Sequence, residues 1–439
     1  MKLTSLRALI VSFAVSFVAS AVGGQLPLTL TPFDASGIYD LGEKAGWTVS
    51  LTNKENSPAA SYRYVLKTNG LVEMESGAID LKSGSARIET KLDEPGMLYL
   101  EITSSASTED RATAGAAVAP TLLEPSVPCP ADFDEFWASK IKMLQAIEAD
   151  PVLVRGETEK AGVDYQTIKL KNIDGSHVYG QIARPAREGK FPAILILQWA
   201  GGPYPLEKAW VADRAAEGWL ALNIQPHDVP GDLPPAFYAA LPTMIKRYNT
   251  IGNDHRDKSY FLRMYLGAYR AADYLANHPN WNGRTLLVTG TSMGGQQSLA
   301  VAGLHPRITH LIVHVPAGAD SNASLHGRAA GYPNWDMSDP RVRETALYFD
   351  TVYFANRIRI PSLVSMGFLD TVCPPAGIWT AFNLITGPKE VVPLVDAAHN
   401  HESTAEQQQA YTDRSNAWMA ALLKGEAPTI NPLGSSRAD

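Results

Sequence analysis

The chain has 439 residues, of which 45% are hydrophobic and 19% are charged. This is the composition of a globular protein and excludes a disordered, collagen-like or coiled-coil chain, and the length suits two to three domains. The 38 Lys and Arg residues against 45 Asp and Glu residues give a formal charge of −7. Because a nucleic-acid-binding surface needs an excess of basic residues, we expect no nucleic acid partner.

The beginning of the chain has the pattern of a secretory signal peptide, which we place at residues 1–21. Lys2 and Arg7 precede an apolar stretch from Ala8 to Val18, and small residues follow up to Ala21. The alternative is a membrane anchor, but the apolar stretch is shorter than the roughly 20 residues that span a bilayer. We therefore expect a periplasmic or secreted protein without a stable membrane anchor.

The sequence contains two cysteines, Cys129 and Cys373, which are too few for a disulfide scaffold. They could form one bridge, but they lie far apart in the sequence, and free buried thiols are common in protein cores. We expect both to be unpaired. The sequence contains neither an H-E-x-x-H nor a C-x-x-C motif, which are typical of metal sites, so we expect no metal and no cofactor.

Residues 25–118 have the signals of a small antiparallel β-sandwich. Apolar residues alternate with polar ones, as from Trp47 to Leu51, which is the period of a half-buried strand. Asn69-Gly70 and Pro95-Gly96 are typical turn dipeptides between such strands. A stretch rich in Ala, Ser, Thr and Pro follows, and we assign residues 119–130 as a linker.

The pattern changes in residues 131–424, where helical periodicity alternates with short apolar runs. A helix is expected to begin after Asp132, and another spans Phe261 to Ala276. The alternation predicts an α/β domain with a doubly wound, mostly parallel sheet that is covered on both faces. Residues 425–439 lack this pattern, and we expect them to form a loose tail. The expected strands are Ala193–Leu197, Trp219–Ile224, Leu286–Thr289, Leu311–Val315 and Ser362–Met366.

The strongest chemical signal is a G-x-S-x-G motif at Gly290 to Gly294. It follows an apolar strand and precedes a helical pattern, which is the context of the nucleophile elbow of α/β-hydrolases. Such a turn exposes the serine at a helix N-terminus, where backbone N–H groups stabilise an oxyanion. The alternative is a glycine-rich loop without catalysis. We interpret Ser292 as the nucleophile.

A serine nucleophile needs a base, and the base needs an acid that orients it. Asp370 follows an apolar strand and suits the acid, although it could instead cap the helix expected near Pro374. His399 and His401 come after the next apolar segment, where the base is expected in this fold. The residues alone do not distinguish the two histidines.

Several short segments resemble, in order, those of the acetyl xylan esterase and cephalosporin-C deacetylase family, which is carbohydrate esterase family seven. The resemblance extends over about Pro130 to Lys424, and it is more specific than the serine motif alone. The segments are Ala131-Asp132-Phe133-Asp134-Glu135-Phe136-Trp137, the elbow around Ser292, Tyr348-Phe349-Asp350, Asp370, Cys373-Pro374-Pro375, Gly387-Pro388-Lys389-Glu390 and His401-Glu402.

The resemblance implies a serine esterase of the α/β-hydrolase fold. It would remove acetyl groups from acetylated xylo-oligosaccharides or related glycans through an acyl-enzyme. In the family the catalytic histidine precedes a glutamate, which selects His401 here. The oxyanion donors would be the backbone N–H groups of Met293 and Trp199. Trp335 and Trp379 could stack on sugar rings or pack in the core, so the substrate-binding residues stay open.

The chain also departs from the family pattern. Met293 stands where the family has Gln, and Trp199 stands where it has Tyr. The family's Arg-Gly-Gln motif, which supports the active-site loops, is replaced by Gln225-Pro226-His227-Asp228. The additional β domain is absent from the single-domain family pattern, which leaves the oligomeric state open.

Two other functions fit parts of the sequence. A serine peptidase of the prolyl oligopeptidase kind also joins a β domain to a hydrolase domain, but its propeller is much larger than residues 25–118. A catalytically inert glycan-binding protein would need only the β domain. The series Ser292, Asp370 and a histidine favours the esterase.

Overall fold

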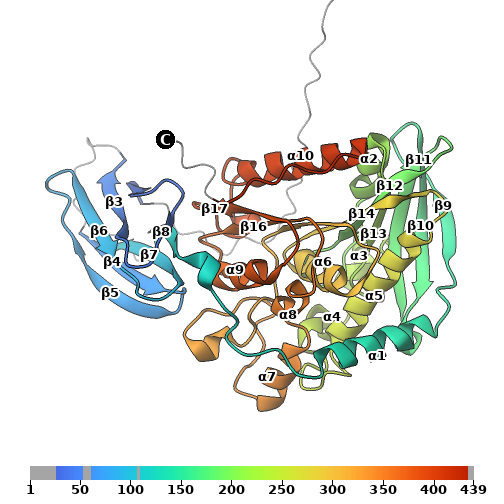
Figure 1. Cartoon of the computed structure of the whole chain (residues 1–439), viewed down its shortest axis with the longest axis horizontal. Coiled ribbons are helices and arrows are strands. Elements are labelled where there is room, and N and C mark those ends of the chain that lie inside the picture. The colour runs from blue at the N-terminus through green and yellow to red at the C-terminus, as the bar shows by residue number, and fades with distance from the viewer. Residues whose placement is uncertain (1–25, 53–60, 106–108, 434–439) are drawn as a thin grey trace, which may run out of the picture.

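The computed structural model describes residues 26–52, 61–105 and 109–433, and the expected signal peptide lies outside them. The described residues form three β-sheets, of three, five and nine strands. The two smaller sheets form a domain at one side of the molecule, and the large sheet with its helices forms the rest (Figure 1). This is an α/β-hydrolase fold preceded by a small β-sandwich, as the sequence predicted.

The β domain contains the first eight strands, packed as two sheets. The strands are β1 (Leu28–Pro32), β2 (Ile38–Tyr39), β3 (Ala45–Leu51), β4 (Tyr62–Thr68), β5 (Val72–Ile79), β6 (Ser85–Thr90), β7 (Gly96–Ser104) and β8 (Arg111–Val118). The order is β1-β3-β6 in one sheet and β2-β8-β7-β4-β5 in the other. Buried residues such as Trp47 and Leu100 fill the space between them. The predicted turn at Asn69 and Gly70 adopts positive φ and joins β4 to β5.

The large sheet has the order β17-β16-β15-β14-β12-β13-β11-β10-β9. The six strands from β17 to β13 are parallel to one another, and β11, β10 and β9 continue the sheet in antiparallel pairing. The strands are β9 (Val152–Gly156), β10 (Val163–Lys171), β11 (His177–Pro185), β12 (Phe191–Leu197), β13 (Leu220–Ile224), β14 (Trp281–Thr291), β15 (His310–His314), β16 (Ser362–Gly367) and β17 (Lys389–Leu394). The three antiparallel strands were not predicted.

Helices cover both faces of the large sheet, because its central strands are apolar on both sides. Leu195 packs on the face covered by α1, α5, α6, α8 and α9, whereas Ile194 packs against α2 and α10 on the other face. The helices are α1 (Phe133–Gln145), α2 (Ala209–Glu217), α3 (Pro235–Ala239), α4 (Thr243–Lys246), α5 (Tyr260–Ala276), α6 (Met293–Leu304), α7 (Pro340–Leu347), α8 (Thr351–Ala355), α9 (Pro375–Leu384) and α10 (Gln409–Lys424), with the short 3₁₀ helices η1 (Pro120–Leu122), η2 (Ile173–Gly175), η3 (Tyr248–Thr250), η4 (Ala323–His326) and η5 (Asn400–Glu402).

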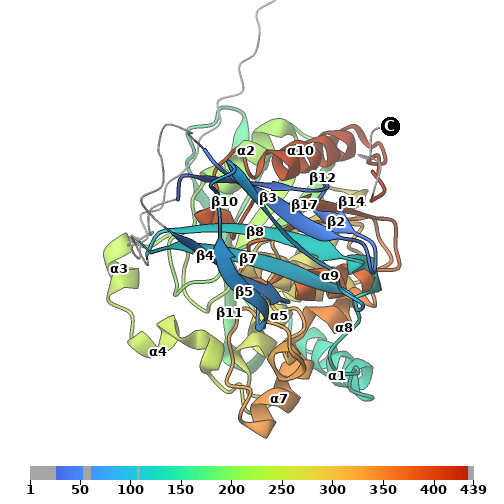
Figure 2. The same ribbon diagram turned by 90° about the vertical axis from the view of Figure 1, so that its left-hand side faces the viewer.

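The segment between the two domains is held along its length by the hydrolase domain. The amide of Asn383 donates to the carbonyls of Pro120 and Leu123, both at 2.9 Å. The hydroxyl of Tyr353 donates to the carbonyl of Val127 at 2.8 Å. In Figure 2 the β domain lies in front of the hydrolase domain, against which its five-stranded sheet packs. The predicted linker therefore joins domains that are in direct contact.

The segment after α10, which was expected to be loose, is fixed in its first part. Glu390 accepts from the backbone N–H of Asn431 at 3.1 Å, and Arg414 donates to the carbonyl of Thr429 at 2.8 Å. Both cysteines are unpaired, with Cys129 exposed and Cys373 buried. Among the described residues, none of the helices has the length and apolarity to cross a bilayer.

Candidate active site

Ser292 lies at the sharp turn between β14 and α6, as the sequence predicted. Its backbone has φ 57° and ψ −121°, which is strained for a residue with a side chain. The flanking glycines are needed for steric reasons. A Cβ on Gly290 would lie 2.3 Å from the carbonyl carbon of Gly294, and a Cβ on Gly294 would lie 2.2 Å from the carbonyl oxygen of Leu197. The close approach of three backbone segments therefore produces this elbow.

The structure brings Ser292, Asp370 and His399 into one hydrogen-bonded series. His399 Nε2 lies 3.0 Å from Ser292 Oγ, and His399 Nδ1 lies 2.7 Å from Asp370 Oδ2. The other carboxylate oxygen of Asp370 accepts from the backbone N–H groups of Val372 at 2.9 Å and Cys373 at 2.7 Å. With Nδ1–H donating to the carboxylate, Nε2 is left to accept the serine proton.

The topology of the sheet explains why three distant residues meet. Ser292 follows β14, Asp370 follows β16 and His399 follows β17, and all three strands are parallel. Their carboxyl ends therefore lie at the same edge of the sheet, where open α/β sheets carry their sites. The side chains of His399 and Asp370 are 3% and 0% exposed, so water is largely excluded from the pair.

The structure corrects the choice of histidine. The family resemblance selected His401, but its side chain is 59% exposed and its Nε2 lies 3.8 Å from Glu402 Oε1. The rings of His401 and His399 meet edge to face, with centroids 5.3 Å apart. Both residues lie in the loop around η5, where two positions of chain are enough to reverse the direction of a side chain. The glutamate that follows is therefore no guide to the base in this chain.

A second buried histidine, which the sequence analysis missed, supports the loop that carries His399. His314 Nδ1 lies 2.6 Å from Ser365 Oγ, and its Nε2 lies 3.1 Å from Gln408 Oε1. The amide of Gln408 in turn donates to the carbonyl of Asn400 at 2.7 Å. Burial lowers the pKa of His314 to about 4, so the ring is neutral at neutral pH. A row of uncharged groups thus connects β15 and β16 to this loop.

The two expected oxyanion donors lie on neighbouring pieces of backbone. Met293 is the first residue of α6, so its N–H has no acceptor within the helix and points out of the helix N-terminus. Trp199 follows β12, which pairs with β14. The side chain of Gln297 in α6 donates to the carbonyl of Gln198 at 3.0 Å and so ties the Trp199 loop to the same helix.

The segment that replaces the family's Arg-Gly-Gln motif holds the Trp199 loop. Gln225 Nε2 donates to the carbonyl of Tyr204 at 2.5 Å, and His227 Nε2 lies 2.9 Å from the carbonyl of Gly201. His227 Nδ1 lies 2.8 Å from the hydroxyl of Tyr260. Burial lowers the pKa of His227 to about 4. The neutral ring therefore donates through Nε2 and accepts from Tyr260 through Nδ1.

The unusual Met293 side chain is used for packing. It is fully buried, and its Sδ lies 3.0 Å from the hydroxyl of Tyr248 and 3.3 Å from that of Tyr332. Burial raises the pKa of Tyr248 to about 12, so this hydroxyl stays protonated and can donate. The side chain at position 293 thus points into the protein, and the backbone N–H alone is available to the site.

Asp370, Cys373 and His399 also form the kind of group that could hold a metal, with their ligand atoms within 4.8 Å of one another. The hydrogen bonds of the Ser292 series already explain this closeness. Burial raises the pKa of the Cys373 thiol well above its ordinary value, which disfavours the thiolate that metals bind. That the site works without a metal or cofactor stays a prediction.

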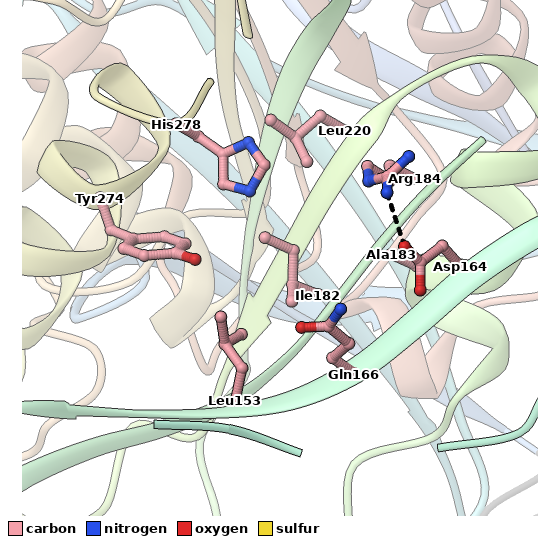
Figure 3. A pocket seen from close by; sticks show the side chains of 9 residues that line it. All are labelled: Leu153, Asp164, Gln166, Ile182, Ala183, Arg184, Leu220, Tyr274 and His278. Carbon is pink, nitrogen blue, oxygen red and sulfur yellow. Dashed lines mark hydrogen bonds and ion pairs between the residues drawn. The ribbon is translucent and has the colours of Figure 1, made fainter. Parts of the chain in front are cut away.

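Two cavities away from Ser292 are too small for a sugar. The larger has a volume of about 30 Å³, which suits a single water. Its lining includes Leu220 (Figure 3), which is the first residue of β13. It therefore lies toward the amino-terminal ends of the parallel strands, whereas Ser292 follows the carboxyl end of β14. Trp335 and Trp379 are 7% and 0% exposed, so both are core residues and not sugar platforms.

Comparison with known proteins gives consistent results. A family model described as acetyl xylan esterase matches residues 123–324 and 333–420. The acetyl esterase Axe7A of Xylanibacter ruminicola is 31% identical over 412 residues, which cover 90% of this chain and 92% of that protein. The acetyl xylan esterase from Paenibacillus sp. R4 has a TM-score of 0.57 at 20% identity, covering 70% of this chain and 98% of that one. The acetyl xylan esterase 1 from Thermoanaerobacterium sp. JW/SL YS485 has a TM-score of 0.56 at 20% identity, covering 67% and 96%.

Proposed function

Because this chain belongs to the acetyl xylan esterase family, we propose that it removes acetyl groups from acetylated xylo-oligosaccharides or related glycans through an acyl-enzyme. The chain is an ester hydrolase, and the observation that carries the proposed mechanism is the hydrogen-bonded series from Ser292 through His399 to Asp370. In this mechanism Ser292 is the nucleophile, His399 is the base and Asp370 orients the imidazole.

In the first step, Ser292 Oγ attacks the carbonyl carbon of the acetyl ester while His399 Nε2 takes the hydroxyl proton. The negative charge moves to the carbonyl oxygen, where the N–H groups of Met293 and Trp199 stabilise it. The ester bond to the sugar then breaks, and the imidazolium returns its proton to the leaving sugar oxygen. The products of this half-reaction are a free sugar hydroxyl and acetylated Ser292.

In the second step, water replaces the sugar. His399 accepts a proton from the water, and the resulting oxygen nucleophile attacks the acetyl carbon of the acyl-enzyme. A second oxyanion forms in the same place, the bond to Ser292 Oγ breaks, and the serine takes back a proton from His399. Acetic acid leaves and gives its proton to the solvent to become acetate, and the neutral site is restored. Asp370 orients the imidazole and stabilises the imidazolium formed in each half-reaction.

The arrangement of the β domain argues against a peptidase of the prolyl oligopeptidase kind. In the part of the domain that the structure describes, eight short strands in sheets of three and five form a sandwich, not a propeller with a central channel. An inert glycan-binding protein would have no use for the strained serine and its buried partners. We also propose that the enzyme acts in the periplasm or outside the cell, which rests on the signal-peptide pattern of residues 1–21.

The test compares acetate release from acetylated xylo-oligosaccharides with cleavage of a prolyl amide, for the wild-type protein and Ser292→Ala. We expect acetate release by the wild type, loss of several orders of magnitude in Ser292→Ala, and no amide cleavage by either protein. Mass spectrometry of rapidly quenched wild type should find the acetyl group on the peptide that contains Ser292. Equal acetate release by both proteins would remove Ser292 from the mechanism.

A further inference from the structure

The β domain is additional to what the fold of this family needs. The two solved acetyl xylan esterases are covered almost completely by about two thirds of this chain. The match to the acetyl esterase Axe7A covers 90% of this chain and so extends into the β domain. A hydrolase domain of this fold is therefore complete without the sandwich. The role of the sandwich has to be inferred from its position relative to the active site.

The β domain packs on the segments that lead to two of the proposed catalytic residues. On the His399 side, a Cβ on Gly37 would lie 2.8 Å from a methyl group of Val395, which follows β17. Met97 and Ala117 in its five-stranded sheet belong to the hydrophobic core of the hydrolase domain. A Cβ on Gly115 in β8 would lie 2.8 Å from the carbonyl oxygen of Phe368, two residues before Asp370. Figure 1 shows β7 and β8 beside β16, β17 and α9. The outer face of this sheet thus lies at the edge where the site opens.

Tyr99 in β7 continues this face from the packed region toward the His399 loop. The register places Tyr99 directly opposite Gly115 and next to the pair of Met97 and Ala117. Cross-strand partners share a face, so the Tyr99 ring lies beside the place where Phe368 packs on Gly115. Burial, followed by the negative charge of Glu101, raises the pKa of Tyr99, and Glu402 also contributes.

Glu402 connects this face to the reacting groups. It belongs to η5, whose His401 meets the His399 ring at a centroid distance of 5.3 Å. Glu402 and His401 are 45% and 59% exposed, so this part of the loop is open to a ligand. Tyr99, which is partly buried, therefore lies beside the loop of Asp370, and Glu402 of the His399 loop is near enough for its charge to act on the phenol.

We propose that β7 forms one wall of the substrate site and that Tyr99 binds a sugar ring of the acetylated xylan chain next to the ring that carries the ester. This proposal rests on the proposed function. A tyrosine offers an apolar face for the C–H groups of a sugar and a hydroxyl for hydrogen bonds. Beside it, Glu101 and Arg111 lie 3.3 Å apart as an ion pair, and Glu402 adds carboxylate acceptors. Charges of both signs suit a neutral polymer rich in hydroxyl groups.

The test measures the ratio of two Michaelis constants, one for an acetylated xylo-oligosaccharide and one for p-nitrophenyl acetate, which has no neighbouring sugar. Tyr99→Ala should raise the ratio about fivefold, because an aromatic contact contributes about 1 kcal/mol and each 1.4 kcal/mol is tenfold in affinity. Tyr99→Phe should recover most of the effect by restoring the ring. The control is Tyr64→Ala, because Tyr64 in β4 packs on the opposite, inner face of the same sheet.

Each outcome has a defined meaning. A raised ratio in Tyr99→Ala, with an unchanged ratio in Tyr64→Ala, supports the proposal that β7 forms a wall of the substrate site. An unchanged ratio in Tyr99→Ala, whether both substrates are affected in parallel or neither is, overturns it while leaving the esterase in place. If the wild type hydrolyses p-nitrophenyl acetate but releases no acetate from the oligosaccharide, the proposed substrate is wrong, and this inference falls with it.

Discussion

The choice between His399 and His401 can be tested by replacing each with alanine. His399 is within hydrogen-bond distance of both Ser292 and Asp370, at 3.0 Å and 2.7 Å, so His399→Ala removes the base from the series. In serine hydrolases, loss of this histidine lowers kcat by about 10⁶-fold, or about 8 kcal/mol of transition-state stabilisation. We expect a loss of this order here.

The expected effect of His401→Ala follows from its surroundings. The side chain is 59% exposed, and its recorded ring contact is the edge-to-face pair with His399 at 5.3 Å. Such a pair contributes about 0.5–1.5 kcal/mol, which limits the loss in kcat to about tenfold even if the whole contact serves to position His399. The two variants should therefore differ by about five orders of magnitude.

The assay is steady-state hydrolysis of p-nitrophenyl acetate, with kcat and KM measured separately and the fold of each variant checked by circular dichroism. Both variants should be folded, because His401 is exposed and the loop of His399 is also held by the hydrogen bond from Gln408 to Asn400. A folded His399→Ala with near-normal kcat, or a His401→Ala that loses as much as His399→Ala, would refute the assignment of the base.

Three further predictions concern the parts that support the site. His227→Phe removes the hydrogen bond to the carbonyl of Gly201 and should lower kcat about tenfold with little change in KM. The reason is that a displaced oxyanion donor stabilises the transition state less, while substrate binding is nearly unaffected. A rise in KM with unchanged kcat would contradict this prediction. Gly294→Ala places a Cβ 2.2 Å from the carbonyl oxygen of Leu197 and should lower the free energy of unfolding, measured by thermal denaturation, by about 3 kcal/mol or more. The control is Gly267→Ala, whose Cβ would lie 3.3 Å from Val178 and which should lower the free energy of unfolding far less. His227 and His314 have their pKa lowered to about 4 from the ordinary 6.5, so the unfolded chain binds protons that the folded protein excludes. Above pH 6.5 both rings are neutral in the folded and the unfolded chain, and the free energy of unfolding does not depend on them. As the pH decreases from 6.5 toward 4, the free energy of unfolding falls by about 1.4 kcal/mol per pH unit for each histidine. Urea unfolding between pH 7 and pH 5 measures this slope, and His314→Asn should reduce it by one histidine's share; an unchanged slope would contradict the buried neutral ring.

Much of the fold was predictable because its central strands are apolar throughout. The run from Ala193 to Leu197, for example, coincides with the end of β12. The antiparallel strands β9 to β11 were missed because one side of this region faces solvent, and β10 consequently alternates polar and apolar residues as in Ile168-Lys169-Leu170. A search for continuous apolar runs cannot find such strands.

The candidate site was predictable where local chemistry fixes it. The glycines around Ser292 and the position of Asp370 after an apolar strand were sufficient to predict two of the three members of the hydrogen-bonded series. The histidine was not, because the direction of a side chain in the irregular loop around η5 depends on contacts from β15 and from the residue before α10. His314 and Gln408 supply these contacts, and they are more than 80 and about ten positions away from His399 in the sequence. No short motif contains that information.

The fixed linker determines where the protein can be divided. Ser126 donates to the buried carboxylate of Asp320 through both its N–H, at 3.0 Å, and its hydroxyl, at 2.7 Å. Truncation at residue 131 would remove these donors and leave a carboxylate in the interior without them, which is costly. A truncated hydrolase intended to measure the contribution of the sandwich should therefore begin at about Ala119 and retain the whole segment up to Pro130.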